Sequence, residues 1–339
     1  MQEMYTTICR RPQTLLYIVI GISIGVFISM LSNSFQSFPR TKFAVHNTDS
    51  NLDFHDSETD HIDEHHEPHD DSHAHHDDYT IADAMKKKIR VLCWVMTSPN
   101  SLDTKAIHVK HTWGKRCNKI LYMSSVSDPK FPTIGLNVSE GRQHLTGKTM
   151  QAFQYVYKHH FNDADWFMKA DDDTYVIVEN LRYFLSTKNP NDPIYFGHHF
   201  KTIVKGGYHS GGAGYVLSKE ALRRFALLGN SMLCRQDGGA EDAEIGSCLM
   251  KLNVTAGKTV DNLGRSRFHC FGVSTHLHGG FPDWFYKYDS NGARSGIHNI
   301  SDYPITFHYV SPKDMHSLEY YVYHLRPFGI VSGAQDLNV

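Results

Sequence analysis

Beyond residue 80, the hydrophobic and polar positions of the chain form two kinds of segment that alternate. Short apolar runs predict buried strands, and they lie at residues 89–96, 120–123, 165–170 and 194–197. Segments with apolar residues at helical spacing lie between these runs, at residues 102–113, at 148–160 and from the end of the third run to about Leu185. Strands that alternate with helices predict an α/β fold with a mainly parallel sheet, and such sheets bind ligands at the carboxyl ends of their strands.

Three consecutive carboxylates, Asp171-Asp172-Asp173, stand at one of these strand ends. Carboxylates at positions i and i+2 can hold one hard divalent cation, which also contacts the phosphate oxygens of a substrate. An acidic triplet on a surface loop is more often a solvated turn. The strand before it and the two blocks described next favour a metal site.

The first of these blocks is glycine-rich and the second is acidic. Five of the nine residues 206–214 are glycine, and they lead into an apolar run at 215–217. Glycines let a backbone approach a ligand closely, although a tight turn is the alternative. Glu241-Asp242-Ala243-Glu244 opens a helical segment, so its carboxylates either stabilise the helix start or supply a general base. The chain has no Gly-x-Gly-x-x-Gly after a strand and no Walker loop, so we expect no glycine-rich phosphate cradle.

The N-terminal part predicts a membrane anchor. Residues 15–31 are 17 residues without a charge, and Arg10 and Arg11 precede them. The positive-inside rule then puts the N-terminus in the cytosol and the rest in the lumen of the Golgi or endoplasmic reticulum, as in a single-pass type II protein. A cleaved signal peptide is the competing interpretation. We expect a cytosolic tail at 1–14, a signal-anchor at 15–31, a stem at 32–80, a catalytic domain at 81–330 and a tail at 331–339.

The stem has an unusual composition. Residues 55–78 contain eight histidines and ten acidic residues without Lys or Arg, a composition that predicts disorder. It serves either as a solvated spacer or as a loose metal-binding or pH-sensing segment. The chain has a net charge of −2, and residues 79–339 carry +7. A mildly basic domain suits an anionic substrate such as a nucleotide-sugar. We expect no nucleic-acid partner.

Cysteines and sequons agree with a lumenal domain. Five of the six cysteines follow the anchor, where disulfides persist. Because five is odd, at least one thiol is free or pairs between chains. We expect the pairs Cys93–Cys117 and Cys234–Cys248, with Cys270 left over, and Cys9 as a free or palmitoylated thiol. Sequons predict glycosylation at Asn137, Asn253 and Asn299.

Together these blocks resemble a known enzyme family. Residues 166–176, 195–197, 208–218 and 241–242 resemble the Fringe-like beta-1,3-glycosyltransferases, which have the GT-A fold. Residues 108–113, 117–119, 307–310 and 318–327 are similar to the core 1 beta-1,3-galactosyltransferases within that family. The resemblance covers about residues 88–330. It implies Mn²⁺-dependent transfer of galactose from UDP-galactose to the 3-hydroxyl of GalNAc α-linked to Ser or Thr, with inversion, by a homodimer.

The resemblance also implies roles for individual residues. The metal ligands would be Asp171, Asp173 and His308, and the general base would be Asp242. UDP-galactose would be contacted by Met96, Glu140, Gly141, Arg142, Lys148, Asp171 and Asp172. The acceptor would be contacted by Trp284, Tyr309, Gly211 and Gly212. For Trp284, a stacking platform for the acceptor sugar and a buried core residue are both consistent with the sequence.

The chain departs from the family pattern in three places. Thr146-Gly147 stands where we expect an aromatic pair, Cys270 where we expect proline, and residues 297–300 where we expect a cysteine pair. These changes leave open a sister beta-1,3-glycosyltransferase with another acceptor. An inactive, chaperone-like relative is a further alternative, but such a protein should lose the acidic triplet. A lectin-like module is a third alternative, and the candidate general base argues against it because a module that only binds sugar does not need one.

Overall fold

The computed structural model describes residues 78–229 and 232–328, which belong to the compact unit Ala74–Val339. The predicted anchor at 15–31, Cys9, nearly all of the stem and the tail at 331–339 lie outside the described residues. Within the described ranges, no helix combines the length and the apolar character that crossing a membrane requires. The predicted anchor and domain boundaries therefore stay predictions.

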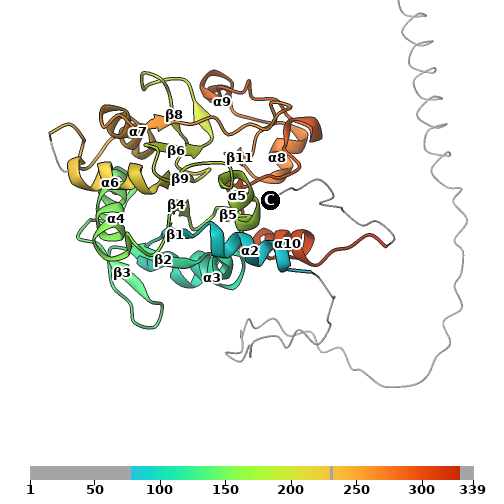
Figure 1. Cartoon of the computed structure of the whole chain (residues 1–339), viewed down its shortest axis with the longest axis horizontal. Coiled ribbons are helices and arrows are strands. Elements are labelled where there is room, and N and C mark those ends of the chain that lie inside the picture. Colours follow the sequence, from blue (N-terminus) through green and yellow to red (C-terminus); the bar gives the residue numbers. More distant parts are fainter. Residues whose placement is uncertain (1–77, 230–231, 329–339) are drawn as a thin grey trace, which may run out of the picture. The chain divides into compact units, whose positions relative to one another are not determined.

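A seven-stranded sheet forms the centre of the fold (Figure 1), with the order β10-β6-β9-β4-β1-β2-β3. All neighbours are parallel except β9, which runs antiparallel to both β4 and β6. The predicted mainly parallel sheet is thus confirmed. The bounds are β1 Val91–Met96, β2 Lys119–Ser124, β3 Thr133–Gly135, β4 Trp166–Asp171, β6 Ile194–Gly197, β9 Tyr215–Ser218 and β10 Thr255–Ala256.

Both faces of this sheet are covered. Alternate residues of β1 enter two separate hydrophobic cores, with Val91, Cys93 and Val95 in one and Leu92, Trp94 and Met96 in the other. This explains why the strand reads as a continuous apolar run instead of an alternating one. The helices are α2 Thr80–Lys88, α3 Ile107–His111, α4 Leu145–His160, α5 Val178–Leu185, α6 Lys219–Leu228, α7 Glu241–Lys251, α8 Val273–His278, α9 Asp283–Tyr288 and α10 Pro312–Tyr323.

A second, three-stranded sheet brings together two segments that are far apart in the sequence. It has the order β11-β12-β5, with β11 Phe268–His269, β12 Thr306–Phe307 and β5 Tyr175–Val176. β12 pairs antiparallel with β5, which directly follows the acidic triplet. The Val310 amide also donates to the Asp173 carbonyl at 3.0 Å. The residue after β12, His308, is thereby placed beside the triplet. A two-stranded sheet pairs β7 His199–Phe200 with β8 Tyr208–His209, and β8 lies within the glycine-rich segment 206–214.

The segment predicted as one helix at 102–113 differs most from expectation. It is divided into a π-helical turn η2 at Leu102–Ala106, the short α3, and a 3₁₀ turn η3 at Trp113–Arg116, which contains Gly114. The Thr112 hydroxyl and the Thr112 amide both donate to the His108 carbonyl, at 2.7 and 3.0 Å, and α3 ends at Thr112, whose φ of −109° and ψ of −114° are not helical. The other 3₁₀ turns are η1 Pro99–Ser101, η4 Arg142–His144 and η5 Ile297–Asn299.

Both expected disulfides are present. Cys93 in β1 is bonded to Cys117, Cys234 is bonded to Cys248 in α7, and Cys270 is free and buried. Of the predicted glycosylation sites, Asn137 and Asn253 are exposed. The half-buried Asn299 donates its side-chain amide to the Ser295 carbonyl at 2.7 Å. Glycosylation itself stays a prediction.

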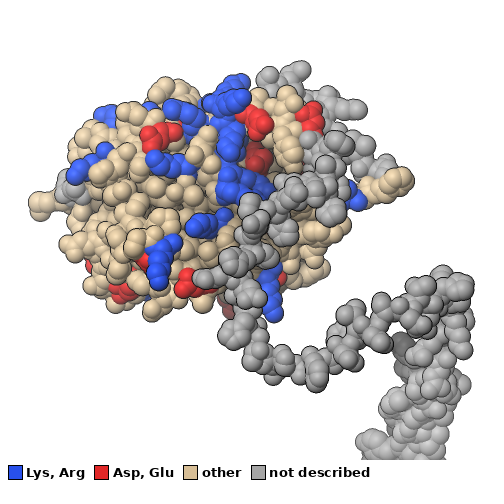
Figure 2. Space-filling view, turned by 90° about the horizontal axis from the view of Figure 1, so that it is seen from below, with Lys and Arg blue, Asp and Glu red and all other residues tan. Residues whose placement is uncertain are grey.

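The surface of the domain agrees with its positive charge. Lys and Arg side chains form a band across the face shown in Figure 2, and Asp and Glu side chains lie beside it. Such a distribution raises the local concentration of anions near the surface, without identifying one.

Candidate active site

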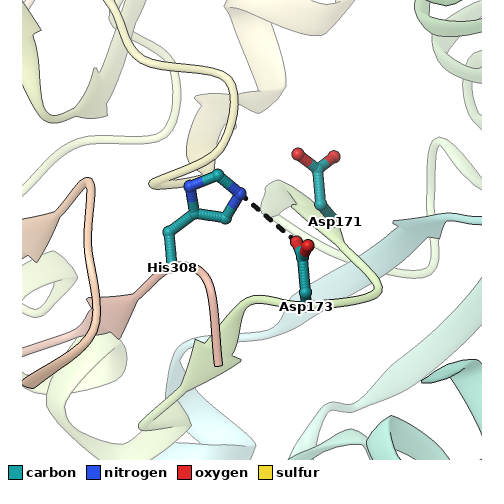
Figure 3. A group of neighbouring side chains, drawn as sticks. All are labelled: Asp171, Asp173 and His308. Carbon is teal, nitrogen blue, oxygen red and sulfur yellow. Dashed lines mark ion pairs between the residues drawn. The ribbon is translucent and has the colours of Figure 1, made fainter. Parts of the chain in front are cut away.

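Three of the predicted site residues form a cluster that could hold a metal ion. Asp171 ends β4, Asp173 lies in the turn after it, and His308 follows β12. One ligand atom from each residue lies within 4.8 Å of the others. The His308 Nε2 is 3.2 Å from the Asp173 Oδ1, and Asp171 lies beside this pair (Figure 3). Two carboxylates and one imidazole form a donor set that suits a cation such as Mn²⁺.

The orientation of His308 is set by its surroundings. Its Nδ1 lies 3.2 Å from the Cys270 carbonyl, which can only accept, so Nδ1 carries a proton and Nε2 is the nitrogen available to a cation. On the other side the ring packs directly against Gly212. A Cβ at position 212 would lie 2.7 Å from Nε2, so this glycine makes room for the ring. The glycine-rich segment thus approaches a side chain closely, and its approach to a ligand stays a prediction.

The second and third carboxylates of the triplet have different environments. Burial favours a raised pKa for Asp173, but His308 and Lys105 outweigh it and lower the pKa to about 2. Burial raises the pKa of Asp172 to about 6, despite Lys105 and the Thr97 hydroxyl. Asp172 accepts from that hydroxyl at 2.9 Å, while Lys105 lies 3.2 Å from Asp173. Asp172 therefore contacts the end of β1, and Asp173 faces His308.

The acidic pair at the start of α7 divides into two roles. Glu241 is buried and its Oε1 accepts from Thr149 and Tyr215, each at 2.8 Å. Asp242 is half-buried and accepts from the Gly211 amide at 3.2 Å and the Ala243 amide at 2.9 Å. Burial raises the pKa of Asp242 in spite of these bonds. Burial raises the pKa of Glu241 as well, so the two carboxylates differ in accessibility: Glu241 is buried and bonded to two hydroxyls, whereas the half-buried Asp242 can be reached by an acceptor hydroxyl.

The residues predicted to contact the donor come from the ends of β1 and β4, from the segment before α4 and from α4 itself. Met96 is opposite Asp171 in the parallel pairing of these strands. The buried Lys148 ammonium donates to the Thr97 carbonyl at 2.9 Å and to Glu140 at 2.7 Å. Gly141 and Arg142 follow Glu140 and are exposed. Thr97 therefore links two of these residues: the Thr97 carbonyl accepts from Lys148, and the Thr97 hydroxyl donates to Asp172.

The departure at Thr146-Gly147 has a structural counterpart. The Gly147 amide donates to Asp237 at 3.3 Å, and Asp237 also lies 2.6 Å from His144. A Cβ at position 147 would lie 2.9 Å from the Asp237 carboxylate, so glycine makes room for this contact. At the place of the expected aromatic pair, the start of α4 is therefore in contact with the carboxylate of Asp237.

Comparison with known proteins places this fold and site in a family. The model of the Fringe-like family matches residues 86–264. Glycoprotein-N-acetylgalactosamine 3-beta-galactosyltransferase 1 of Xenopus laevis is 47% identical over 256 residues, which are 74% of this chain and 71% of the relative. The chain belongs to the Fringe-like family.

Other members are more distant. A beta-1,3-glucosyltransferase of Mus musculus is 32% identical to this Fringe-like chain over 43% of it and 30% of the mouse protein. Chondroitin sulfate synthase 3 of Homo sapiens is 27% identical over 48% of the chain and 20% of the human protein. A solved glycosyltransferase involved in glycosylation of the major capsid of PBCV-1 aligns with a TM-score of 0.29 at 15% identity, over 42% of this chain and 68% of that one.

Beyond residue 264, the Fringe-like chain adds His308 and a row of aromatic rings. Tyr309 lies 3.9 Å from His308 between ring centroids, Phe271 lies 5.9 Å from Tyr309, and Trp284 lies 6.1 Å from Phe271. Trp284 is 44% exposed and Tyr309 is 62% exposed. A buried core role for Trp284 therefore does not fit, and an exposed ring at the end of this row fits a sugar platform.

Sequence reasoning missed three polar residues at the site: Thr97, Lys105 and Lys169. Thr97 directly follows the first strand, so the rule on strand ends could have identified it. Lys169 precedes Asp171 by two residues on β4, and strand alternation puts both side chains on one face. Lys105 comes from the irregular η2 turn, and no pattern in the sequence indicates that it reaches the triplet.

Proposed function

We propose that this chain is a glycoprotein-N-acetylgalactosamine 3-beta-galactosyltransferase, which moves galactose from UDP-galactose to the 3-hydroxyl of GalNAc α-linked to Ser or Thr. The observation that carries the proposal is the connection between Asp171, Asp173 and His308 and the half-buried Asp242, through adjacent glycines. Gly212 packs against His308, and Gly211 donates to Asp242. The 47% identity to the Xenopus enzyme supports the same reaction.

The metal ligands in this proposal are Asp171, Asp173 and His308. Carboxylate oxygens with one imidazole nitrogen suit Mn²⁺ better than a soft thiophilic ion. When bound, a divalent cation would neutralise the charge of the departing diphosphate. The low pKa of Asp173 keeps this ligand ionised across the physiological range.

The remaining proposed residues bind, orient and accept a proton. Asp242 takes the proton of the acceptor 3-hydroxyl as that oxygen attacks the anomeric carbon from the face opposite the leaving group, which inverts the configuration. Glu140, Gly141, Arg142, Lys148, Met96 and Asp172 bind the donor. Trp284 and Tyr309 bind the acceptor sugar, because aromatic rings pack well against the apolar face of a pyranose.

The proposed setting is the lumen of the Golgi or endoplasmic reticulum, with the chain anchored by residues 15–31. Two disulfides in the described domain support an oxidising compartment. A GT-A type fold agrees with the mixed sheet and the carboxylates at the end of β4. The homodimer stays a prediction from the family resemblance.

A transfer assay on the purified full-length chain tests this function. The mixture contains UDP-galactose, a GalNAcα-Ser/Thr glycopeptide and Mn²⁺, with EDTA as the control. We expect a galactosylated product that EDTA abolishes. Binding of UDP and Mn²⁺ without product would refute this acceptor and indicate a sister transferase. Absence of both binding and product would favour the chaperone-like alternative.

A further inference from the structure

A buried lysine lies directly behind the metal-binding carboxylates. Lys169 in β4 is 1% exposed, and its ammonium donates to Asp171 Oδ1 at 2.6 Å and to the Gly211 carbonyl at 3.0 Å. The Glu241 Oε2 lies 3.9 Å from the same nitrogen. The ammonium thus makes two hydrogen bonds, to Asp171 and Gly211, and a longer ion pair with Glu241. The charge of Lys169 is therefore paired inside the protein, and the side chain is too buried to contact a substrate.

Gly211 connects this lysine to the proposed base. Its carbonyl accepts from Lys169 at 3.0 Å, and its amide donates to Asp242 Oδ2 at 3.2 Å. A Cβ at position 211 would lie 2.5 Å from Glu241 Oε2, so glycine lets the backbone pass between the lysine and α7. The ammonium therefore contacts Asp171 directly and, through Gly211, the backbone donor to Asp242.

Lys169 also balances buried negative charge. Glu241 is itself fixed, because its other oxygen accepts from Thr149 and Tyr215. Removing the ammonium would leave Glu241 and Asp171 facing each other without a cation between them. Loss of one partner of a buried ion pair is strongly destabilising, because the remaining charge is left without compensation. Asp171 is the partner that can turn away, since it ends its strand.

We propose that Lys169 is a positioning residue, which holds the metal ligand Asp171 and the base Asp242 in one fixed arrangement through Gly211. This inference rests on the proposed metal site and base. It predicts that Lys169 affects metal affinity as well as turnover, although it contacts neither substrate. Partners that orient metal ligands from behind contribute roughly 10- to 100-fold to metal affinity or activity.

The test substitutes Lys169→Met, which keeps the length of the side chain and removes its charge. Mn²⁺ binding to the full-length chain in the presence of UDP is measured by electron paramagnetic resonance, so the readout needs neither acceptor nor galactose transfer. We expect roughly 10- to 100-fold weaker Mn²⁺ binding. Lys119→Met is the matched control, because it removes a half-buried lysine in β2 that pairs with Asp163 at 2.8 Å, and its Mn²⁺ affinity should equal that of the wild type.

A second variant separates positioning from simple loss of stability. Lys169→Met combined with Glu241→Gln removes both charges of the pair, so its melting temperature should recover relative to the single variant while Mn²⁺ affinity stays low. Wild-type Mn²⁺ affinity in either Lys169 variant, or no Mn²⁺ binding by the wild type, would overturn the inference. If the wild type binds Mn²⁺ but does not galactosylate the glycopeptide, the proposed acceptor fails and the Lys169 comparison still decides this inference.

Discussion

Replacing Gly212 by alanine should weaken metal binding through one side chain, His308. A Cβ at position 212 would lie 2.7 Å from His308 Nε2, and still closer to Cε1 and Nδ1. Non-bonded carbon atoms pack best at about 3.5–4.0 Å, so the ring would have to move by roughly 1 Å or more. The backbone at Gly212 is not in the left-handed region, so the methyl group itself, and not backbone strain, causes the change.

The ring has to move because the glycine cannot. The Gly212 carbonyl accepts from the Thr174 hydroxyl at 2.8 Å, which ties this loop to the turn that carries the triplet. A displaced ring loses its contacts with the Cys270 carbonyl and Asp173, which are both 3.2 Å long. Loss of such orientation typically costs roughly 10- to 100-fold in metal affinity. Calorimetric titration of Mn²⁺ into the chain in the presence of UDP measures this loss of affinity.

Gly272→Ala provides the matched control near the same histidine. A Cβ there would lie 3.8 Å from the His308 and Tyr309 carbonyls, an ordinary contact, and the residue has a φ of −64°. Gly272→Ala should therefore bind Mn²⁺ as the wild type does. The double variant Gly212→Ala with His308→Ala should bind no more weakly than His308→Ala alone, because both changes act through one ligand. Wild-type Mn²⁺ affinity in Gly212→Ala, or additive losses in the double variant, would refute the reasoning.

Four further predictions concern the carboxylates, the aromatic row and a buried histidine. Asp173→Ala should abolish Mn²⁺ binding and turnover, and an active variant would exclude Asp173 as a ligand. Asp242→Asn should keep UDP–Mn²⁺ binding while kcat falls roughly 10²- to 10⁴-fold, and full activity would remove it as the base. Trp284→Ala should raise KM for the glycopeptide without changing UDP affinity, and the reverse pattern would contradict an acceptor role. Burial lowers the pKa of His276 to about 3, so between about pH 6.5 and pH 3 the unfolded chain binds more protons than the folded chain. The free energy of unfolding should therefore fall as the pH is lowered through this range. Denaturant unfolding of His276→Phe should show a flatter pH dependence, and an unchanged slope would assign the effect to other groups.

Local patterns were enough to predict the longer strands of the central sheet and the acidic triplet at the end of one of them. β1, β4 and β6 lie within two residues of the predicted runs, because both faces of this sheet are buried and the runs are mostly apolar. The single helix predicted at 102–113 was wrong because the segment begins as a π-helical turn and the backbone leaves the helical conformation at Thr112, and apolar spacing indicates neither feature. The lysines around the triplet were missed for a related reason. One is hidden in an apolar strand, and the other stands on an irregular turn.

The long-range parts of the site came only from the family resemblance. No local pattern joins His308 to the triplet, since their proximity depends on the pairing of β12 with β5, two strands of two residues each. Such short strands have too few residues for a periodic signal, and their pairing is decided by tertiary packing. The contacts of Gly211 and Gly212 were not predictable from local patterns either. The five glycines at 206–214 indicate that another group lies close to this backbone, but not which group it is. In the structure the His308 ring packs against Gly212, and the Gly211 amide donates to Asp242 at 3.2 Å, so these two glycines join a proposed metal ligand to the proposed base.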